Sequence, residues 1–171
     1  SDEVGVGYID ENVLWYQYAS PSLWITHSIG SIGPSGGNVN VVDFNNDGFP
    51  DVIRAAKALN KVVLFINNSR MGTWDEIVVD DNLRGPFMAN PGDIDNDGDM
   101  DFAVTAQNAT GSEPDLLWYE NDGSGEIWTR HEICNDMSVA RCVWIVDIDS
   151  NDFADLIATD LLANEILLFS N

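Results

Sequence analysis

The segment DIDNDGDMD, residues 93–101, places five aspartates in nine positions. Carboxylates at this density repel one another, so the segment is either a loop solvated by water or a cage around a positive ion. Looser versions of the pattern occur at DFNNDGFPD, residues 43–51, and at DIDSNDFAD, residues 147–155. A pattern that recurs three times indicates a repeated structural unit.

A period of about 50 residues runs through the whole chain. Three independent series of residues share steps of 50 to 54 residues. These series are Trp24, Trp74 and Trp128; Asp43, Asp93 and Asp147; and Trp15, Phe65, Trp118 and Phe169. Three series at one period indicate a tandem repeat, and coincidence is a poor explanation.

Each repeat has the composition of short strands. The middle repeat contains TWDEIVVD, PFMANPGDI, MDFAVTAQ and DLLWYEN, which are rich in β-branched and aromatic residues and separated by Gly, Asn, Asp and Pro. No window of eleven or more residues shows a convincing helical period. Four strands in about 50 residues are typical of a propeller blade, with the aspartate loop between the first and second strands.

The sequence therefore predicts an all-β fold of tandem four-stranded blades of the β-propeller type. We expect about three to three and a half blades with aspartate loops, in a single array over residues 1–171. The approximate repeat units are residues 13–61, 62–115 and 116–165, followed by a final strand at residues 166–171.

The aspartate loops have the chemistry of a cation site. Positions 1, 3, 5 and 9 carry Asp or Asn in all three loops, and the backbone carbonyl at position 7 adds another oxygen. Hard oxygen ligands, several of them charged, suit Ca²⁺. At position 6, Gly48 and Gly98 permit the positive φ of a tight turn, and Asp152 in the third loop tolerates it better than most residues.

Two alternatives compete with the calcium-loop interpretation. An EF-hand requires Glu at position 12 and flanking helices, but that position is Arg54, Val104 or Ala158 and the flanks are strand-like. The other alternative is an acidic solvated turn without a metal ion. Recurrence of the spacing at three strand junctions disfavours that alternative.

The loops, the strands DVI, DFAV and DLIATD that follow them, and the segment LWYEND resemble FG-GAP/VCBS-type repeats. Such repeats form calcium-binding β-propeller blades in extracellular proteins, including integrin α-subunits, some lectins and some polysaccharide-active enzymes. The resemblance implies about three Ca²⁺ sites, and it implies that ligands bind the face opposite the calcium loops. The implied ligands are Asp43, Asn45, Asp47, Asp51 and the Phe49 carbonyl; Asp93, Asp95, Asp97, Asp101 and the Asp99 carbonyl; and Asp147, Asp149, Asn151, Asp155 and the Phe153 carbonyl.

The charge of the chain limits its partners. The net charge is −22, from 29 acidic and 7 basic residues. Such a field disfavours nucleic acid and anionic membranes as partners and favours bound cations. The apolar runs are too short to insert into a membrane as a spanning segment. We therefore expect an extracellular or cell-surface protein.

The preferred function is a non-catalytic module that binds a glycan or an extracellular protein, or that builds a surface assembly. The alternative is part of a polysaccharide-active lyase or hydrolase with a propeller scaffold. Whether the chain is an enzyme stays uncertain, but no Gly-x-Ser-x-Gly motif is present. The seven basic residues are scattered along the sequence and predict no clamp for an acidic polysaccharide.

Two cysteines and two asparagines are candidate modification sites. Cys134 and Cys142 bracket the short segment CNDMSVARC and are either a disulfide, in an oxidising compartment, or two free thiols. Asn67 in NNS and Asn108 in NAT are acceptors for N-glycosylation if the source is eukaryotic and secretory.

The aromatic and histidine residues mostly predict packing. His27 and His131 occupy the same position of the repeat, which favours a shared packing role over catalysis. The tryptophans that recur in phase are expected in the core between blades. Trp144 occupies the position of Asn40 and Asn90, so it is the better candidate for a special role.

The ends of the array are predicted to be incomplete. The strand resembling LWYEN occurs four times, whereas the aspartate loop occurs three times. The first blade therefore lacks its first strand and the last blade lacks its last. Because exposed strand edges pair with other strands, we expect either a piece of a longer propeller or self-association into an oligomer or filament.

Overall fold

The computed structural model describes residues 4–9, 12–33, 36–68, 72–107 and 113–171, with no side-chain description for residues 4–9. These residues form four antiparallel sheets in sequence order. Sheet 1 contains β1 (Val4–Ile9), β2 (Asn12–Ser20) and β3 (Leu23–Ser31). Sheet 2 contains β4 (Val39–Val42), β5 (Asp51–Ala56), β6 (Lys61–Asn67) and β7 (Trp74–Asp80), with the short 3₁₀ helix η1 (Lys57–Leu59) between β5 and β6. Sheet 3 contains β8 (Pro86–Gly92), β9 (Asp101–Ala106), β10 (Leu116–Asn121) and β11 (Trp128–Cys134). Sheet 4 contains β12 (Ala140–Val146), β13 (Asp155–Asp160) and β14 (Glu165–Phe169).

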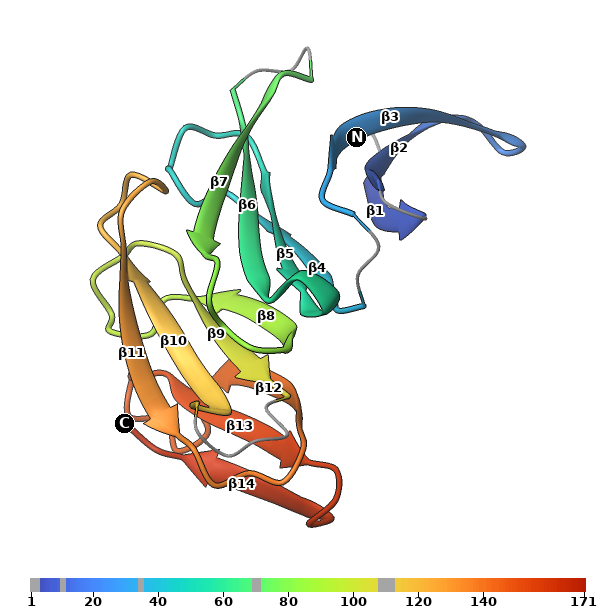
Figure 1. Cartoon of the computed structure of the whole chain (residues 1–171). Helices are drawn as coiled ribbons and strands as arrows, with labels where there is room; N and C mark the ends of the chain where they lie inside the picture. The colour runs from blue at the N-terminus through green and yellow to red at the C-terminus, as the bar shows by residue number, and fades with distance from the viewer. Residues whose placement is uncertain (1–3, 10–11, 34–35, 69–71, 108–112) are drawn as a thin grey trace.

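The four sheets follow one another along an open arc, with the chain termini at opposite ends (Figure 1). The first strands β4, β8 and β12 lie on the inside of the array, where β8 contacts both of the others. Each aspartate loop joins the first strand of a sheet to the second. The predicted all-β fold of tandem four-stranded blades is therefore confirmed, and the described sheets do not close into a ring.

The two end sheets have three strands each among the described residues. The first strand of sheet 1, β1, is equivalent to β5 and β9, the second strands of the middle sheets. The last strand of sheet 4, β14, is equivalent to β6 and β10, the third strands of the middle sheets. This is the pattern of missing strands that the sequence predicted. Because each sheet starts with the strand before its aspartate loop, every approximate repeat unit of the sequence spans parts of two sheets.

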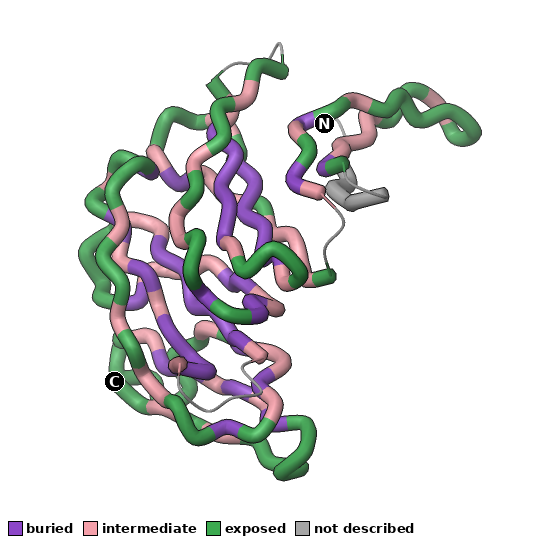
Figure 2. Tube along the Cα trace, viewed as in Figure 1, coloured by how far each residue is buried: buried purple, intermediate pink, exposed green. Residues whose placement is uncertain are grey.

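Three hydrophobic clusters lie between successive sheets. Val13 and Ile29 of sheet 1 pack with Phe65 of sheet 2, and Leu64 of sheet 2 packs with Phe102 of sheet 3. The third cluster joins sheets 3 and 4 and includes Ala103, Leu116, Val143, Leu156 and Ala158. Burial is deepest in sheets 2 and 3 and sparse in the β2–β3 hairpin (Figure 2).

The second strands of the middle sheets are buried at every residue. DVIRAA in β5 and DFAVTA in β9 lack the alternation of a half-exposed strand because a neighbouring sheet covers each face. DLIATD in β13 is only partly buried, because the described residues place a sheet on one of its faces.

A bulge recurs in each fourth strand. The pairing registers leave Ile29, Val79 and Ile133 without a partner residue on the third strand. Such a bulge turns an additional side chain towards one face and increases the local twist. Each of the three residues packs in the cluster between its own sheet and the next. The isoleucines end the segments WITHSI and WTRHEI, and the sequence analysis did not recognise this role.

The structure corrects one of the three repeat series. Asn67, Asn121 and Asn171 occupy equivalent positions, because the N–H of each donates to the last aspartate of its own sheet's loop. Phe65 is therefore equivalent to Tyr119, whereas Trp118 is equivalent to Leu64. The aromatic series was therefore one residue out of register at Phe65 and at Phe169, because these third strands carry their aromatic residue one position later than Trp118.

The in-phase tryptophans have different environments. Trp15, Trp74, Trp118 and Trp128 pack against the inter-sheet clusters, as predicted. Trp24 is 45% exposed, so the prediction of a core position is wrong for this residue. It lies at the outer end of the β2–β3 hairpin and packs edge-on against Tyr18. No helix among the described residues is long and apolar enough to cross a membrane.

Candidate metal centres

The first aspartate of each loop fixes the loop's own backbone. Oδ1 of Asp93 accepts a hydrogen bond from the N–H of Asp97 (3.2 Å), and Oδ2 accepts one from the N–H of Gly98 (3.1 Å). Asp43 and Asp147 accept the same two bonds from the fifth and sixth residues of their loops. The three loops therefore share one conformation, although their sequences differ.

The side chains at positions 3 and 5 also bond the loop backbone. Oδ1 of Asp95 accepts the N–H of Asp97 at 3.2 Å, and Oδ1 of Asp97 accepts the N–H of Asp99 at 2.9 Å. Asn45 and Asp149 take the place of Asp95 in the other loops. The side-chain oxygens at these two positions thus turn towards the backbone of their own loop.

Two positions of each loop adopt positive φ. At position 6 the values are 87° for Gly48, 98° for Gly98 and 69° for Asp152. The expected turn at this position is therefore confirmed, including the substitution of Asp for Gly. Position 4 has values of 56° to 65° at Asn46, Asn96 and Ser150. Asn46 and Asn96 were the sequence signal for positive φ at position 4, because Asn tolerates positive φ well.

The aspartate at position 9 joins the loop to the third strand of the sheet. Asp51, Asp101 and Asp155 are each fully buried. Oδ2 of Asp101 accepts the N–H of Ile94 at 2.9 Å, and Oδ1 accepts the N–H of Asn121 at 2.9 Å. The corresponding donors are Phe44 and Asn67 for Asp51, and Ile148 and Asn171 for Asp155.

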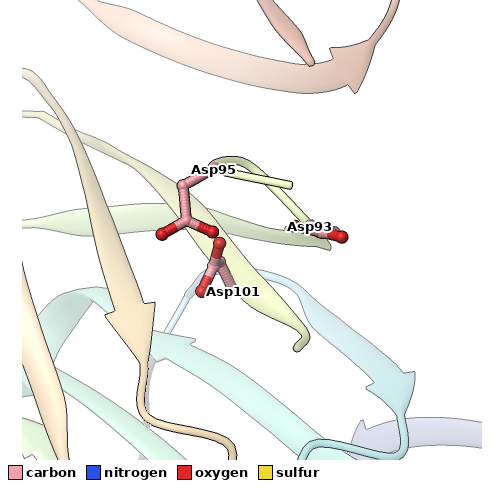
Figure 3. Close-up of side chains that lie close together, drawn as sticks. All are labelled: Asp93, Asp95 and Asp101. Atoms are coloured by element: carbon pink, nitrogen blue, oxygen red, sulfur yellow. The ribbon is translucent and has the colours of Figure 1, made fainter. Parts of the chain in front are cut away.

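Carboxylates converge in two of the loops. Ligand oxygens of Asp93, Asp95 and Asp101 lie within 4.8 Å of one another, and those of Asp147, Asp149 and Asp155 do the same. Asp95 and Asp101 point towards each other from the loop and from β9 (Figure 3). These acidic clusters could bind a metal ion, because each gathers hard oxygen donors at one point.

The first loop differs at position 3. Asn45 stands where the other loops have Asp, and its Nδ2 donates to Oδ2 of Asp47 at 3.2 Å. Its Oδ1 faces the same backbone N–H as the carboxylate of Asp95 does in the second loop. At positions 1, 3, 5 and 9 the first loop therefore carries three aspartates, as the third loop does, whereas the second loop carries four.

Burial makes the ionised aspartates costly in the protein alone. It raises the pKa of Asp51 and of Asp101 to about 6, although two backbone N–H groups bonded to each carboxylate oppose the shift. Burial also raises the pKa of Asp95, and the carboxylate of Asp97 adds to that shift. A cation among these groups would offset the cost of desolvation and of repulsion.

Asparagines link successive loops, a role that the sequence analysis missed. Nδ2 of Asn121 donates to the carbonyl of Phe44 in the first loop at 2.7 Å. Nδ2 of Asn171 donates to the carbonyl of Ile94 in the second loop at 3.5 Å. Asn121 ends β10 and Asn171 lies two residues after β14, so the recurrence of Asn after LFI, LWYE and LLFS was the available signal. Asp99 accepts a bond from Nδ2 of Asn46 (2.9 Å) and adds a further link.

The implied carbonyl ligands and the modification sites stay predictions. The predicted carbonyls at position 7 belong to Phe49, Asp99 and Phe153. Cys134 and Cys142 are free thiols in the structure, and Sγ of Cys134 lies 2.8 Å from Oδ1 of Asp136. Asn67 ends β6, and its Nδ2 donates to the carbonyl of Pro50 at 3.2 Å. Asn108 lies outside the described residues.

The two histidines pack on tryptophans, which confirms their predicted role. His27 stacks on Trp15 with ring centroids 4.0 Å apart, and His131 stacks on Trp118 at 4.3 Å. Nε2 of His131 lies 2.7 Å from Oε2 of Glu120. Each pair joins the third and fourth strands of one sheet.

The comparisons with known proteins agree with this geometry. A family model described as FG-GAP-like repeat matches the chain twice, at residues 43–104 and 93–158. Each match begins at the first aspartate of a loop and includes the next loop. No curated protein matches the chain significantly.

Proposed function

The chain belongs to the FG-GAP-like repeat family, and on that basis we propose that it is a calcium-stabilised extracellular module. In this proposal a β-propeller-type scaffold binds a glycan or an extracellular protein, or takes part in a surface assembly. The observation that carries the metal is the convergence of three carboxylates in the second and third loops. The first loop has equivalent backbone bonds.

Calcium fits the donors better than other common ions. The proposed ligands are carboxylate, amide and carbonyl oxygens, without thiols or imidazoles, which disfavours zinc and copper. Up to five oxygens per loop suit Ca²⁺, whereas Mg²⁺ prefers few protein ligands and keeps its water. The net charge of −22 adds a general attraction for divalent cations.

The role of the ion is structural in this account. The aspartate at position 9 accepts a backbone bond from its loop and another from the end of the third strand. An ion bound to that aspartate would hold the loop and three strands of the sheet together. Because Asn121 and Asn171 also connect successive loops, ordering one loop would stabilise the next.

Thermal unfolding tests the proposal. Each ion held at a hundred times its dissociation constant adds about 2.7 kcal/mol of stability by mass action. EDTA should therefore lower the melting temperature by many degrees, and Ca²⁺ should restore it more fully than Mg²⁺. An unchanged melting temperature in EDTA would contradict the proposal. A glycan array in calcium buffer would then test the binding role.

Self-association is the second candidate function, and the outer face of sheet 4 favours it. We define this outer face by Trp144, Val146, Ile157, Ile166 and Leu168. Four of these residues are 41% to 76% exposed, and Ile157 is half-buried. The equivalent positions Ile53 and Leu64 of sheet 2 are fully buried against sheet 3.

The occupant that we propose for the outer face of sheet 4 is sheet 1 of a second copy. At the internal junctions, one face of each sheet packs against the sheet before it, and on sheet 3 this face includes Trp128, which packs on Phe44 of the loop in sheet 2. Sheet 1 has the equivalent face, and its Trp24, at the position of Trp128, is exposed. Such a head-to-tail contact does not use the same patch twice and would give chains of copies. Sedimentation velocity over a range of concentrations would detect it, and a monomer at high concentration would contradict it.

A further inference from the structure

Two cations and an aromatic ring meet on the side of the array that lies away from the aspartate loops. Phe87 is on β8, Lys57 is on η1 and Arg141 is on β12. Nζ of Lys57 lies 5.7 Å from the centroid of the Phe87 ring, and Cζ of Arg141 lies 4.7 Å from it. The scattered basic residues predicted no clamp from sequence alone, but the fold brings Lys57 and Arg141, 84 positions apart, to the same ring.

These cations have no carboxylate partner among the described residues. Carboxylates elsewhere in the described chain do pair with cations, as Asp80 and Glu132 do with Arg130 and Glu120 does with His131. Because the chain has 29 acidic and 7 basic residues, carboxylates that could pair with Lys57 and Arg141 are abundant. Nζ of Lys57 instead donates to Oε1 of Gln107, whose buried Nε2 has no hydrogen-bond partner within the described part of the chain. The cluster of Lys57, Arg141 and Phe87 therefore has net positive charge, and the neighbouring Nε2 of Gln107 is a hydrogen-bond donor that is not used within the described residues.

Phe87 and Arg141 line an open cleft of about 520 Å³. This volume is within the range of small-ligand sites. Leu161 and Ile166 add apolar wall, and Thr159 adds a hydroxyl.

Two carboxylates also border the cleft. Oδ1 and Oδ2 of Asp160 already accept hydrogen bonds from the N–H groups of Ser138, Val139, Leu162 and Ala163. Glu165 is exposed to water, where its charge is screened. Within the described residues, the guanidinium of Arg141 is therefore the charged group of the cleft that has no hydrogen bond or ion pair with the protein.

We propose that this cleft binds the carboxylate of an acidic sugar, a uronate residue. Arg141 donates two parallel hydrogen bonds to the carboxylate. The ammonium of Lys57, which contacts the Phe87 ring but does not line the cleft, adds attraction at longer range. The apolar walls cover the C–H face of the sugar ring. Contact with the Phe87 ring holds both cations in place before binding, which lowers the entropy that binding costs.

This proposal rests on the role as a glycan-binding module and names its ligand class. It does not use the metal loops, so the two can fail separately. If the melt depends on calcium but no uronate binds, the uronate site alone is overturned.

Titration calorimetry with a galacturonate trisaccharide in saturating calcium tests the site. The double variant Lys57→Gln/Arg141→Gln should bind about tenfold or more weakly, the range expected for a lost charge-assisted hydrogen bond. The matched control is Lys61→Gln/Arg84→Gln, which removes the same charge from basic residues that do not contact Phe87. It should bind within about twofold of the parent. A neutral galactose trisaccharide should not bind.

Three results would overturn the proposal. One is the absence of galacturonate binding, and another is equal weakening in both double variants, which would show general attraction only. The third is equal binding of the neutral sugar, or binding of a tetraglutamate peptide in place of the sugar. If the melting temperature of the double variant falls below the assay temperature, Arg141→Gln alone replaces it, because Arg141 is the charged donor that lines the cleft.

Discussion

Two rows of side chains occupy the same place in different sheets and have opposite environments. In sheet 2, Asn40, Ile53 and Leu64 lie in register across three strands, and sheet 3 covers them. In sheet 4, the equivalent row is Trp144, Ile157 and Leu168. Leu64 is fully buried, whereas Leu168 is 54% exposed.

The difference shows that burial depends on the neighbouring sheet more than on the strand itself. Nδ2 of Asn40 donates to the carbonyl of Ala89 on the next sheet, so this asparagine connects two inner strands. Trp144 stands at its position in sheet 4 and is 59% exposed. The middle junction should therefore contribute most of the stability, and the end face should contribute little until something covers it.

The largest effect is expected from the middle junction. Phe102 is fully buried and contacts the rings of Phe44, Tyr119 and Trp128. Phe102→Ala should lower the free energy of unfolding by about 3–5 kcal/mol, because it removes apolar contacts and leaves a cavity. Leu168→Ala should lower it by no more than about 0.5 kcal/mol at low protein concentration. Urea denaturation measures both, and similar losses would erase the distinction between the two regions.

The next effect concerns the aspartate that joins loop and third strand. Asp101→Ala leaves two buried N–H groups without an acceptor and should cost about 2–5 kcal/mol in calcium. Asp155→Ala should cost less, because its two donors, the N–H groups of Ile148 and Asn171, are only partly buried at the end of the array. Thermal unfolding of both variants tests this order. A larger loss for Asp155→Ala would reverse the comparison between middle and end.

A smaller effect separates the first and second loops. Asp95 and Asn45 accept the same backbone bond, but only Asp95 brings a charge to the site. Asp95→Ala should therefore remove more of the calcium-dependent gain in the free energy of unfolding than Asn45→Ala, by roughly 1–2 kcal/mol. Thermal unfolding with and without calcium measures this gain.

Melts in EDTA supply the control for this pair. Asp95→Ala should be no less stable than the parent without calcium, because burial and Asp97 raise the pKa of the Asp95 carboxyl. Equal small losses for both variants in calcium would count against the ranking of the loops.

The smallest effect on stability is expected at the exposed end. Trp144→Asn introduces the residue of the two equivalent internal positions. It should change the free energy of unfolding of the monomer by no more than about 0.5 kcal/mol, because the side chain is exposed. It should nevertheless weaken the concentration-dependent association seen by sedimentation velocity. Unchanged association would show that the outer face of sheet 4 is not the contact.

Local sequence was enough to predict the blades and the loops. The alternation of Asp and Asn at residues 93–101 gave the turn, and the strands on both sides carried their own β-branched and aromatic residues. Even Asp152 in place of glycine adopts the expected positive φ. These features depend on neighbours in the chain, which a sequence displays directly.

Features that depend on packing between sheets were harder to predict. The bulge at Ile133, the bond from Asn121 to Phe44 and the shared contact of Lys57 and Arg141 with Phe87 each join residues from different strands. Trp24 and Trp128 have the same place in the repeat, but among the described residues a preceding sheet packs on Trp128 and none packs on Trp24. A single sequence does not show which face receives a neighbour.

The most direct test of the central claim is a count of bound calcium ions by native mass spectrometry. The parent chain in dilute calcium should carry three ions, one for each aspartate loop. Asp95→Ala should carry two at a concentration that fills the parent, because the second loop loses a charged ligand. A parent chain that binds no calcium, or a count that Asp95→Ala leaves unchanged at every concentration, would contradict the assignment of the loops as calcium sites.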